Sequence, residues 1–569
     1  MKTQYSDDIS SNNHPHSVLQ DCLFLSLVVL LSLILYVQNL GFYSDDWAFL
    51  GLSSMSADKS LLGLFKMLYE PPLAVAPAIG AHMRPLQLLY FAGLYSLFDS
   101  DPLGYHLVNG AVLLSSVVLF YLVLCEVSQE RLLNLAVAVV YALLPHYSTD
   151  RFWVAAFQTN LSMALYFLSL YSDLRAVRGE GLRLWGWKLL SILSLLGSTL
   201  AYEIVLPLFL FNPLLVWYRR RQLYGSVPGR QLSPKKLAVL FGSNLLALMV
   251  VIVFKAVTTT RIGHLKNTHI LWFGWHIAKA FFTSYGEYGL GLPAVIFKIL
   301  RDYQNWVILT MGVVVGSLVF WYLYRAISQS QAKLPNQTLM LRFIVSGLVV
   351  FGLGYAIFLI NRNAENTATG IGNRIAIAAA VGVSLSMVGG LGWVSNRLRS
   401  DPLRRRFFCV LVAMLCTSGF LINNTLALFW ITAYRQAQAV IVDIRREFPT
   451  LPTGSTLILD GVCPYVGPAI VFESSWDLTG VLMMLYRDYS LRADVVTPNL
   501  KVREDGLSTL LYGGEFHYPY KKMFIYHFGR KMTYHLTDAA TARRYFQTFN
   551  PDHSSACPQG REAYGVRVF

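Results

Sequence analysis

Runs of apolar residues long enough to cross a lipid bilayer constrain this chain more than any other feature of its sequence. A membrane-spanning helix needs about 20 such residues. Clear candidates lie at 21–40, 106–127, 132–145, 154–171, 237–256, 304–324, 339–360, 374–395 and 407–430. Hydrophobic residues make up 54% of the 569 residues and charged residues only 14%, a combination that is not typical of soluble globular domains. The sequence therefore predicts a polytopic α-helical membrane protein.

The apolar stretch at 188–218 needs a separate interpretation, because basic clusters flank both of its ends. A single crossing would leave one cluster on the wrong side of the membrane. Two short helices that turn at "AYEIVLP" put both clusters in the cytoplasm, and Pro207 favours a turn there. We therefore predict about 11 transmembrane helices, with the amino terminus inside and the carboxyl terminus outside.

The net charge of +15 is explained by the positions of the basic residues. They gather between apolar runs at Arg175, Arg178, Arg183 and Lys188, at Arg219 to Arg221, and at Arg404 to Arg406. Such clusters are typical of the cytoplasmic loops of membrane proteins. The charge therefore requires no nucleic-acid partner, and membrane lipids are the expected surroundings.

This topology divides the chain into three parts. Residues 1–20 form a cytoplasmic tail, 21–431 the transmembrane module and 432–569 an extracytoplasmic domain. The first apolar run is too long for a signal-peptide core and no small-residue cleavage site follows it, so we expect it to be retained. The long first outer loop covers 41–105.

Three short apolar segments on the outer side have helical periodicity. They are "LLGLFKMLY" (61–69), "PLQLLYFAGLYSLF" (85–98) and the stretch 268–284, which carries Trp272, Trp275 and His276. We expect helices that lie at the membrane interface. The second of them has a transmembrane alternative.

After Trp430 the sequence changes character. Residues 433–449 form an amphipathic pattern, and "STLILD", "AIVFES", "RADVVTP" and "KMFIYHF" are typical of strands around a helical "WDLTGVLMMLYRDY". The prediction is a small C-terminal α/β domain. Cys463 and Cys557 lie in this polar part, where an oxidising compartment would permit a disulfide.

Two adjacent carboxylates, Asp45 and Asp46, follow the first span in "GFYSDDWAFLG". Neighbouring side chains point in different directions on a helix or strand. A carboxylate in a partly dry cleft can act as a general base, because burial raises its pKa. A solvated loop pair or a helix amino-terminal cap before "WAFLGL" explains the same residues without any chemistry.

A resemblance to a known family emerges over residues 82–123. The acidic pair after the first span, Arg84–Pro85 opening an apolar helix that ends in "LF", and "P-x-x-YHLVN" leading the next span resemble the polytopic GT-C glycosyltransferases. The similarity is closest to the branch that uses polyprenyl-phosphate sugars, which includes protein O-mannosyltransferases and lipid A aminoarabinose transferases. "LPHYSTDRFWVAAFQTN" and "LAYEIVLPL" resemble further landmarks of the family more loosely.

The resemblance implies an activity and roles for three residues. The activity is transfer of one sugar, with inversion, from a polyprenyl-phosphate carrier to the hydroxyl of a glycan, lipid or protein acceptor on the extracytoplasmic face. By carry-over, Asp45 is the general base, Asp46 the paired second acid and Arg84 the cation that holds the carrier phosphate. A bacterial inner (plasma) membrane, with the active site and C-terminal domain facing the periplasm or exterior, is the expected location.

The sequence departs from the family pattern in two places. Relatives often have a second acid at the start of the fourth span, where this chain has Asn160, and Asp150 lies ten residues earlier. Relatives also often have a basic residue in the turn where Tyr202 and Glu203 stand. These departures affect the predicted contacts with acceptor and donor. An acid inside an apolar run is expensive, so Glu203 is a candidate for function or a water-exposed turn residue.

Other basic residues in the outer loops are candidates for binding the carrier phosphate. Arg362 and Arg374 flank one outer loop, and His264 and Lys266 lie in another. An arginine at a span end commonly snorkels to the headgroups, which is the alternative for Arg374, and the loop residues have a solvated alternative. His82 is a single histidine, for which a structural role is the alternative.

The sequence predicts no cofactor. Asp45 with Asp46 could supply oxygen ligands to Mg²⁺ or Mn²⁺, but an isolated acidic pair is a weak metal signal, and there is no phosphate-binding or dinucleotide-binding glycine motif. Alternatives to a transferase are a transporter or flippase for a lipid-linked saccharide, which favours charges within several spans, and an enzyme like the O-antigen polymerases or ligases.

Overall fold

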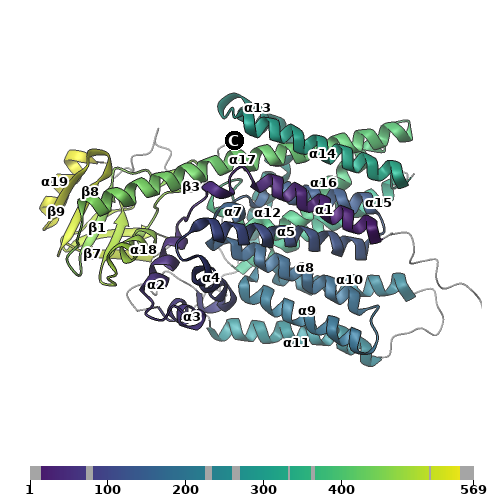
Figure 1. Cartoon of the computed structure of the whole chain (residues 1–569), viewed down its shortest axis with the longest axis horizontal. Coiled ribbons are helices and arrows are strands. Elements are labelled where there is room, and N and C mark those ends of the chain that lie inside the picture. Colours follow the sequence, from purple (N-terminus) through teal and green to yellow (C-terminus); the bar gives the residue numbers. More distant parts are fainter. Residues whose placement is uncertain are drawn as a thin grey trace, which may run out of the picture.

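The computed structural model describes residues 15–71, 81–224, 234–258, 270–330, 334–360, 366–511 and 514–551. A bundle of long helices makes up most of the molecule, and a smaller part with strands lies at one end (Figure 1). The two parts are joined through α17 (Asp401–Glu447), which extends from the bundle to the strands. The predicted fold class, a helical membrane protein with a small C-terminal α/β domain, is confirmed.

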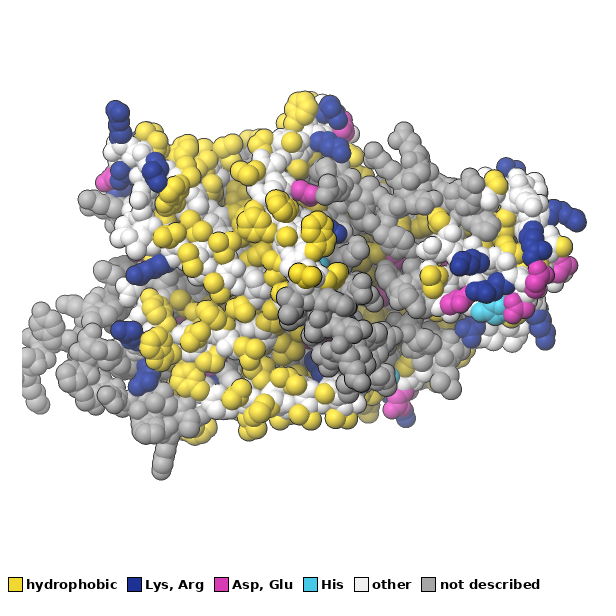
Figure 2. All heavy atoms as spheres, turned by 180° about the vertical axis from the view of Figure 1, so that it is seen from behind, with side chains coloured by type: hydrophobic (Ala, Val, Ile, Leu, Met, Phe, Trp, Pro, Cys, Tyr) yellow, Lys and Arg dark blue, Asp and Glu magenta, His cyan; other side chains and the backbone are white. Residues whose placement is uncertain are grey.

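Eight helical segments of the described chain are long and apolar enough to cross a membrane. They contain α1 (Pro15–Leu33), α5 (Pro102–Val127), α9 (Gly181–Ala201), α11 (Pro234–Thr258), α14 (Trp306–Ser330), α15 (Gln337–Tyr355), α16 (Ile377–Ser395) and α17. Figure 2 shows a broad hydrophobic surface over these helices, with Lys and Arg gathered toward the end opposite the C-terminal domain. The chain is an integral membrane protein.

Three further predicted spans are also helical. They are α6 (Arg131–Leu143), which is short, and α8 (Gln158–Ala176) and α10 (Leu206–Tyr224), which are less apolar or more charged than the eight. The total of 11 spans stays a prediction.

The stretch 188–218 folds as the two predicted helices. Helix α9 ends at Ala201, Tyr202 adopts an extended conformation, and a 3₁₀ turn (η6, Glu203–Val205) leads into α10. Pro207 lies in the first turn of α10, where its missing N–H costs nothing. This turn fixes the position of Glu203.

The first outer loop is mostly helical. It follows η1 (Val37–Asn39) and contains α2 (Asp45–Met55), α3 (Leu61–Tyr69), η3 (Ala81–Met83) and α4 (Pro85–Phe98). The predicted helices 61–69 and 85–98 are therefore confirmed as helices. Ser60 caps α3 by accepting a hydrogen bond from the Gly63 N–H, and Pro85 occupies the first turn of α4.

Shorter elements connect the long helices of the bundle. They are η4 (Pro145–Tyr147), α7 (Thr149–Phe152), η5 (Ala155–Phe157), α12 (Ile270–Phe281), the π-helical segment η8 (Phe282–Leu290), α13 (Leu292–Asp302), η9 (Ala356–Ile360) and η10 (Ile371–Ala376). The helix expected within 268–284 corresponds to α12 and the start of η8.

The last span and the predicted amphipathic helix at 433–449 are one continuous helix of 47 residues. No Gly or Pro interrupts the chain between Gly419 and Pro449, so the helix continues from the span into the amphipathic segment. The boundary predicted at 431/432 therefore falls inside α17.

The C-terminal domain contains a four-stranded sheet in the order β4-β1-β8-β9. Strand β1 (Thr456–Asp460) is parallel to β4 (Arg492–Val495) and to β8 (Met523–His527), and β9 (Met532–Leu536) is antiparallel to β8. These parallel strands match three of the predicted strands.

The other strands of the domain form two small antiparallel sheets. They are β2 (Tyr465–Val466) with β3 (Ala469–Ile470), and β5 (Lys501–Val502) with β6 (Gly506–Leu511) and β7 (Gly514–Pro519). The predicted strand "AIVFES" is limited to the two residues of β3. Helices α18 (Ser475–Tyr486) and α19 (Ala539–Phe549) and the turn η11 (Phe528–Arg530) complete the domain.

Candidate active site

The two adjacent aspartates occupy different environments at the start of α2. The Asp46 side chain is fully buried, and its two carboxylate oxygens accept hydrogen bonds from the Tyr43 N–H (2.9 Å) and the Ala155 N–H (2.6 Å). Asp45 is only partly buried. Asp46 therefore ties the turn at 43–46 to the backbone at Ala155, whereas Asp45 remains partly exposed.

The backbone before Asp45 is held in an unusual conformation. Ser44 has φ 44°, which is rare for a residue other than glycine. Tyr43 anchors the turn, because its hydroxyl donates to the Trp430 carbonyl oxygen (2.9 Å) and its own carbonyl oxygen accepts from the Trp153 indole N–H (2.9 Å). The position of Asp45 is thus set by contacts with α17 and with the segment after α7.

The Asp45 carboxylate interacts with two arginines. Burial raises the pKa of Asp45 above its usual value, while the positive charges of Arg374 and Arg84 and a hydrogen bond from Trp476 lower it. The two arginines come from η10 and from the residue before α4. The structure therefore brings together Asp45, Arg84 and Arg374, which sequence reasoning placed in one site.

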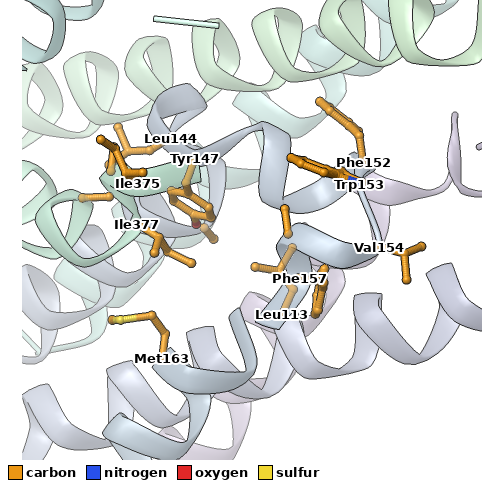
Figure 3. Packing of buried hydrophobic residues seen from close by; sticks show 14 of the residues in the cluster. Leu113, Leu144, Tyr147, Phe152, Trp153, Val154, Phe157, Met163, Ile375 and Ile377 are labelled. Carbon is orange, nitrogen blue, oxygen red and sulfur yellow. The ribbon is translucent and has the colours of Figure 1, made fainter. Parts of the chain in front are cut away.

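Arg374 is positioned by packing on an aromatic ring. Its guanidinium lies 4.8 Å from the centre of the Trp153 ring. The neighbouring Asn373 accepts hydrogen bonds from the Ser148 hydroxyl (3.1 Å) and the Thr149 N–H (3.2 Å), which docks η10 against η4 and α7. Figure 3 shows the buried hydrophobic residues of the same segments: Ile375 and Ile377 lie near Tyr147, and Trp153 lies beside Phe152.

Arg84 belongs to a cluster of charges at the turn between α9 and α10. Its guanidinium forms two hydrogen bonds to the Glu203 carboxylate (3.1 and 2.5 Å) and lies 4.1 Å from the centre of the Tyr202 ring. Lys255 of α11 contacts the same carboxylate at 3.3 Å. Burial alone would raise the pKa of Glu203, but Arg84 and then Lys255 lower it to about 2. The two cations and one carboxylate leave a net charge of +1.

Asp150 and Asn160, the two residues considered for the position of the family's second acid, lie together. The Asn160 side-chain amide donates to the Asp150 carbonyl oxygen (2.9 Å), and both side chains are fully buried. Burial raises the pKa of Asp150 well above its usual range, while the charges of Arg374 and Arg151 lower it in part. Asp150 is therefore electrostatically linked to the same Arg374 as Asp45.

The remaining candidate residues do not join this group. The His82 side chain is exposed, and its ring contacts the ring of Tyr69. Arg362, His264 and Lys266 lie outside the described residues. So does Cys557, and the disulfide between Cys463 and Cys557 stays a prediction.

Sequence reasoning missed three residues of the site. Lys255 had a recognisable signal, because it is an ionisable residue within the apolar run 237–256. Glu473 and Trp476 come from the C-terminal domain. The Glu473 carboxylate accepts hydrogen bonds from the Ser44 hydroxyl (2.6 Å) and the Tyr465 hydroxyl (2.5 Å). The sequence indicated Glu473 and Trp476 only weakly, as an acidic and an aromatic residue where a predicted strand meets a predicted helix.

Across the described ranges, no group of three or more His, Cys, Asp or Glu side chains is arranged to hold a metal ion. Both oxygens of Asp46 already accept backbone N–H groups. The site consists of one accessible carboxylate between two cationic groups, at the end of a membrane bundle and against a small α/β domain.

No protein-family model matches the chain, and no curated protein matches it. Among solved structures, the chain is similar to ArnT from Cupriavidus metallidurans in the apo state, with 12% identity, a TM-score of 0.39, and coverage of 78% of this chain and 82% of that one. It is also similar to ArnT bound to undecaprenyl phosphate (12% identity, 83% and 85% coverage, TM-score 0.36).

A third similar structure is the archaeal oligosaccharyltransferase AglB from Archaeoglobus fulgidus, in complex with an inhibitory peptide and a dolichol-phosphate. The identity is 12%, the coverage 79% of this chain and 63% of that one, and the TM-score 0.36.

Proposed function

We propose that the chain is a membrane glycosyltransferase that moves one sugar from a polyprenyl-phosphate carrier to an acceptor hydroxyl. The main support for the proposal is the difference between the environments of the two aspartates. Asp46 is buried and fully hydrogen-bonded, whereas Asp45 is accessible and faces the positive charges of Arg374 and Arg84. An accessible base beside cations suits a reaction in which a hydroxyl loses a proton and a phosphate leaves.

In the proposed reaction, Asp45 takes the proton of the acceptor hydroxyl as its oxygen bonds to the anomeric carbon of the donor sugar. The bond between that carbon and the carrier phosphate oxygen breaks, and its electron pair leaves with the phosphate. Attack on the face opposite the leaving phosphate inverts the anomeric carbon.

Arg84 and Arg374 are the groups proposed to stabilise the charge that develops on the leaving phosphate. Arginine suits this role because its planar guanidinium is always charged and can form two hydrogen bonds to one phosphate. The pairing of Arg84 with Glu203 fixes the guanidinium plane, and the extra charge of Lys255 keeps the cluster cationic.

The proposed orientation places this site on the extracytoplasmic side. The basic residues of the bundle gather toward the opposite end (Figure 2), as positive residues do on the cytoplasmic side of membrane proteins. Nucleotide sugars are not supplied outside the cytoplasm, which favours a lipid-linked donor. The acceptor class, whether glycan, lipid or protein, is left open by the site.

The test is sugar transfer by the purified protein in liposomes that contain a polyprenyl-phosphate sugar and candidate acceptors. General-base catalysis contributes about 10²- to 10⁴-fold to a rate. We expect Asp45→Asn to lose transfer by at least that factor while its binding of the lipid carrier is retained. Asp58→Asn is the matched control, because Asp58 is an exposed acid in the same outer loop. Wild-type turnover by Asp45→Asn would remove Asp45 as the base.

A further inference from the structure

We propose that Glu473 is a positioning residue for Asp45, so that the C-terminal α/β domain completes the active site. This inference rests on the proposed function. It concerns a residue that is separated from Asp45 by more than 400 positions in the sequence and that the family resemblance did not include.

The first observation is the close docking of α18 from the C-terminal domain onto α2. A Cβ atom added to Gly480 would lie 2.2 Å from the Trp47 carbonyl oxygen, and one added to Gly51 would lie 2.6 Å from the Gly480 carbonyl oxygen. The backbones of the two helices are thus in direct contact. Side chains larger than hydrogen would force them apart, so these glycines fix the distance between the domain and the helix that carries Asp45.

The contact is secured at both ends of α2. At the carboxyl end, the Arg487 guanidinium donates a hydrogen bond to the Ser54 carbonyl oxygen. At the amino end, the Ser44 hydroxyl donates to the Glu473 carboxylate at 2.6 Å. Helix α2 is therefore held along its whole length by α18 and the residues that flank it, Glu473 and Arg487.

Glu473 is placed to control the turn before Asp45. Its side chain is 2% exposed, and its second carboxylate oxygen accepts from the Tyr465 hydroxyl. Ser44, which it holds, is the residue with positive φ. A non-glycine residue keeps such a conformation only when its surroundings enforce it. The hydrogen bond from Ser44 to Glu473 is a direct link between that turn and the C-terminal domain.

Electrostatics connects the same two acids. Burial raises the pKa of Glu473, the hydrogen bonds from Ser44 and Tyr465 lower it, the charge of Asp45 raises it and that of Arg374 lowers it. Glu473 and Asp45 therefore share Arg374. Glu473 is enclosed by protein groups, so it acts on the reaction through Ser44 and Asp45 rather than by touching the substrate.

The test compares Glu473→Gln with Asp494→Asn in the full-length protein. Asp494 is a matched control, because it is a buried carboxylate of the same domain that also accepts two hydroxyl groups, from Thr509 and Tyr518 (2.7 Å each). A glutamine has one acceptor oxygen instead of two and carries no charge, so it cannot accept both hydroxyls as Glu473 does. Loss of one such charge-assisted hydrogen bond corresponds to about tenfold in rate. We expect Glu473→Gln to lower kcat by about tenfold or more with the donor KM unchanged, and Asp494→Asn to leave kcat unchanged.

Ser44→Ala removes the other partner of the same bond. If Glu473 acts through Ser44, we expect Ser44→Ala to lower kcat as Glu473→Gln does, and the double variant to be little worse than either one. Equal turnover of Glu473→Gln and Asp494→Asn would overturn the inference, and so would a purely additive double variant.

Hydrogen exchange of backbone amides tests the positioning role of Glu473 independently of the proposed sugar transfer. The Asp46 and Trp47 amides donate to the Tyr43 and Ser44 carbonyl oxygens, and they should exchange faster in Glu473→Gln than in the wild type or Asp494→Asn. An unchanged exchange rate would overturn the positioning role even if the wild type transfers no sugar. If the wild type transfers no sugar but the amides exchange faster, the proposed function fails and the structural link stands.

Discussion

Replacing Asp46 by Asn tests whether the two adjacent acids differ as the structure indicates. Asp46 accepts one backbone N–H on each carboxylate oxygen, from Tyr43 and from Ala155, and no part of its side chain reaches the solvent. An asparagine keeps one acceptor oxygen but places a donor NH₂ group against the other N–H. One hydrogen bond is lost and one buried donor is left without a partner.

The magnitude follows from these two changes. A hydrogen bond contributes about 1 kcal/mol net, or up to about 3 when one partner is charged, and an unpaired buried donor costs about 1–3 kcal/mol. Asp46→Asn should therefore destabilise the protein by about 2–6 kcal/mol. Asp45→Asn changes a partly exposed side chain without these bonds, so its effect on stability should stay within about 0.5 kcal/mol.

The assay is thermal unfolding in detergent, followed by the fluorescence of the 12 tryptophans and compared with sugar transfer below the unfolding temperature. We expect Asp46→Asn to unfold at a clearly lower temperature than the wild type, and Asp45→Asn to unfold with the wild type but to be inactive. An Asp46→Asn variant with wild-type stability, or an Asp45→Asn variant that is the less stable of the two, would refute the assignment.

Three further predictions concern the same site and the C-terminal domain. Arg84→Ala should raise the KM for the lipid-linked donor by at least tenfold, since a charged hydrogen bond to the phosphate is lost, and an unchanged KM would argue against its phosphate role. Because the pKa of Asp45 is raised and only its ionised form accepts a proton, kcat/KM should fall on the acid side with an apparent pKa above that of an ordinary aspartate; an acid limb at the ordinary aspartate pKa, or none at all, contradicts the base role. Intact protein should show a mass increase on reduction and alkylation that maps to Cys463 and Cys557, whereas two free thiols would disprove the disulfide.

Local signals in the sequence were sufficient for most helices. The helices at 61–69 and 85–98 follow from apolar spacing together with Ser60 as a cap and Pro85 in the first turn. The turn between α9 and α10 follows from the basic clusters at both ends of one apolar stretch. Strand β6 was missed because "GLSTLL" lacks a clear alternation of apolar and polar residues, whereas "GEFHYP" in β7 does alternate from Glu515 to Tyr518 and was a signal that sequence reasoning missed.

The roles of the site residues depend on contacts that the sequence does not encode locally. Asp45 and Asp46 are adjacent and chemically identical. Only the contact between Asp46 and Ala155, 109 positions away, makes one of them structural. The contact between Ser44 and Glu473 spans 429 positions and requires α17 to carry the C-terminal domain back onto α2. The sequence predicted a site that contains both acidic and basic residues. It did not show which of the two aspartates is tied up in hydrogen bonds to the backbone.

The most direct test of the account is a density map of the full-length protein with polyprenyl phosphate bound. We predict that the phosphate lies between Arg84 and Arg374 and faces the Asp45 carboxylate, with the carrier chain running along the apolar surface of the bundle. A phosphate bound at the opposite, basic end of the bundle, or bound without contact to either arginine, would contradict the central claim.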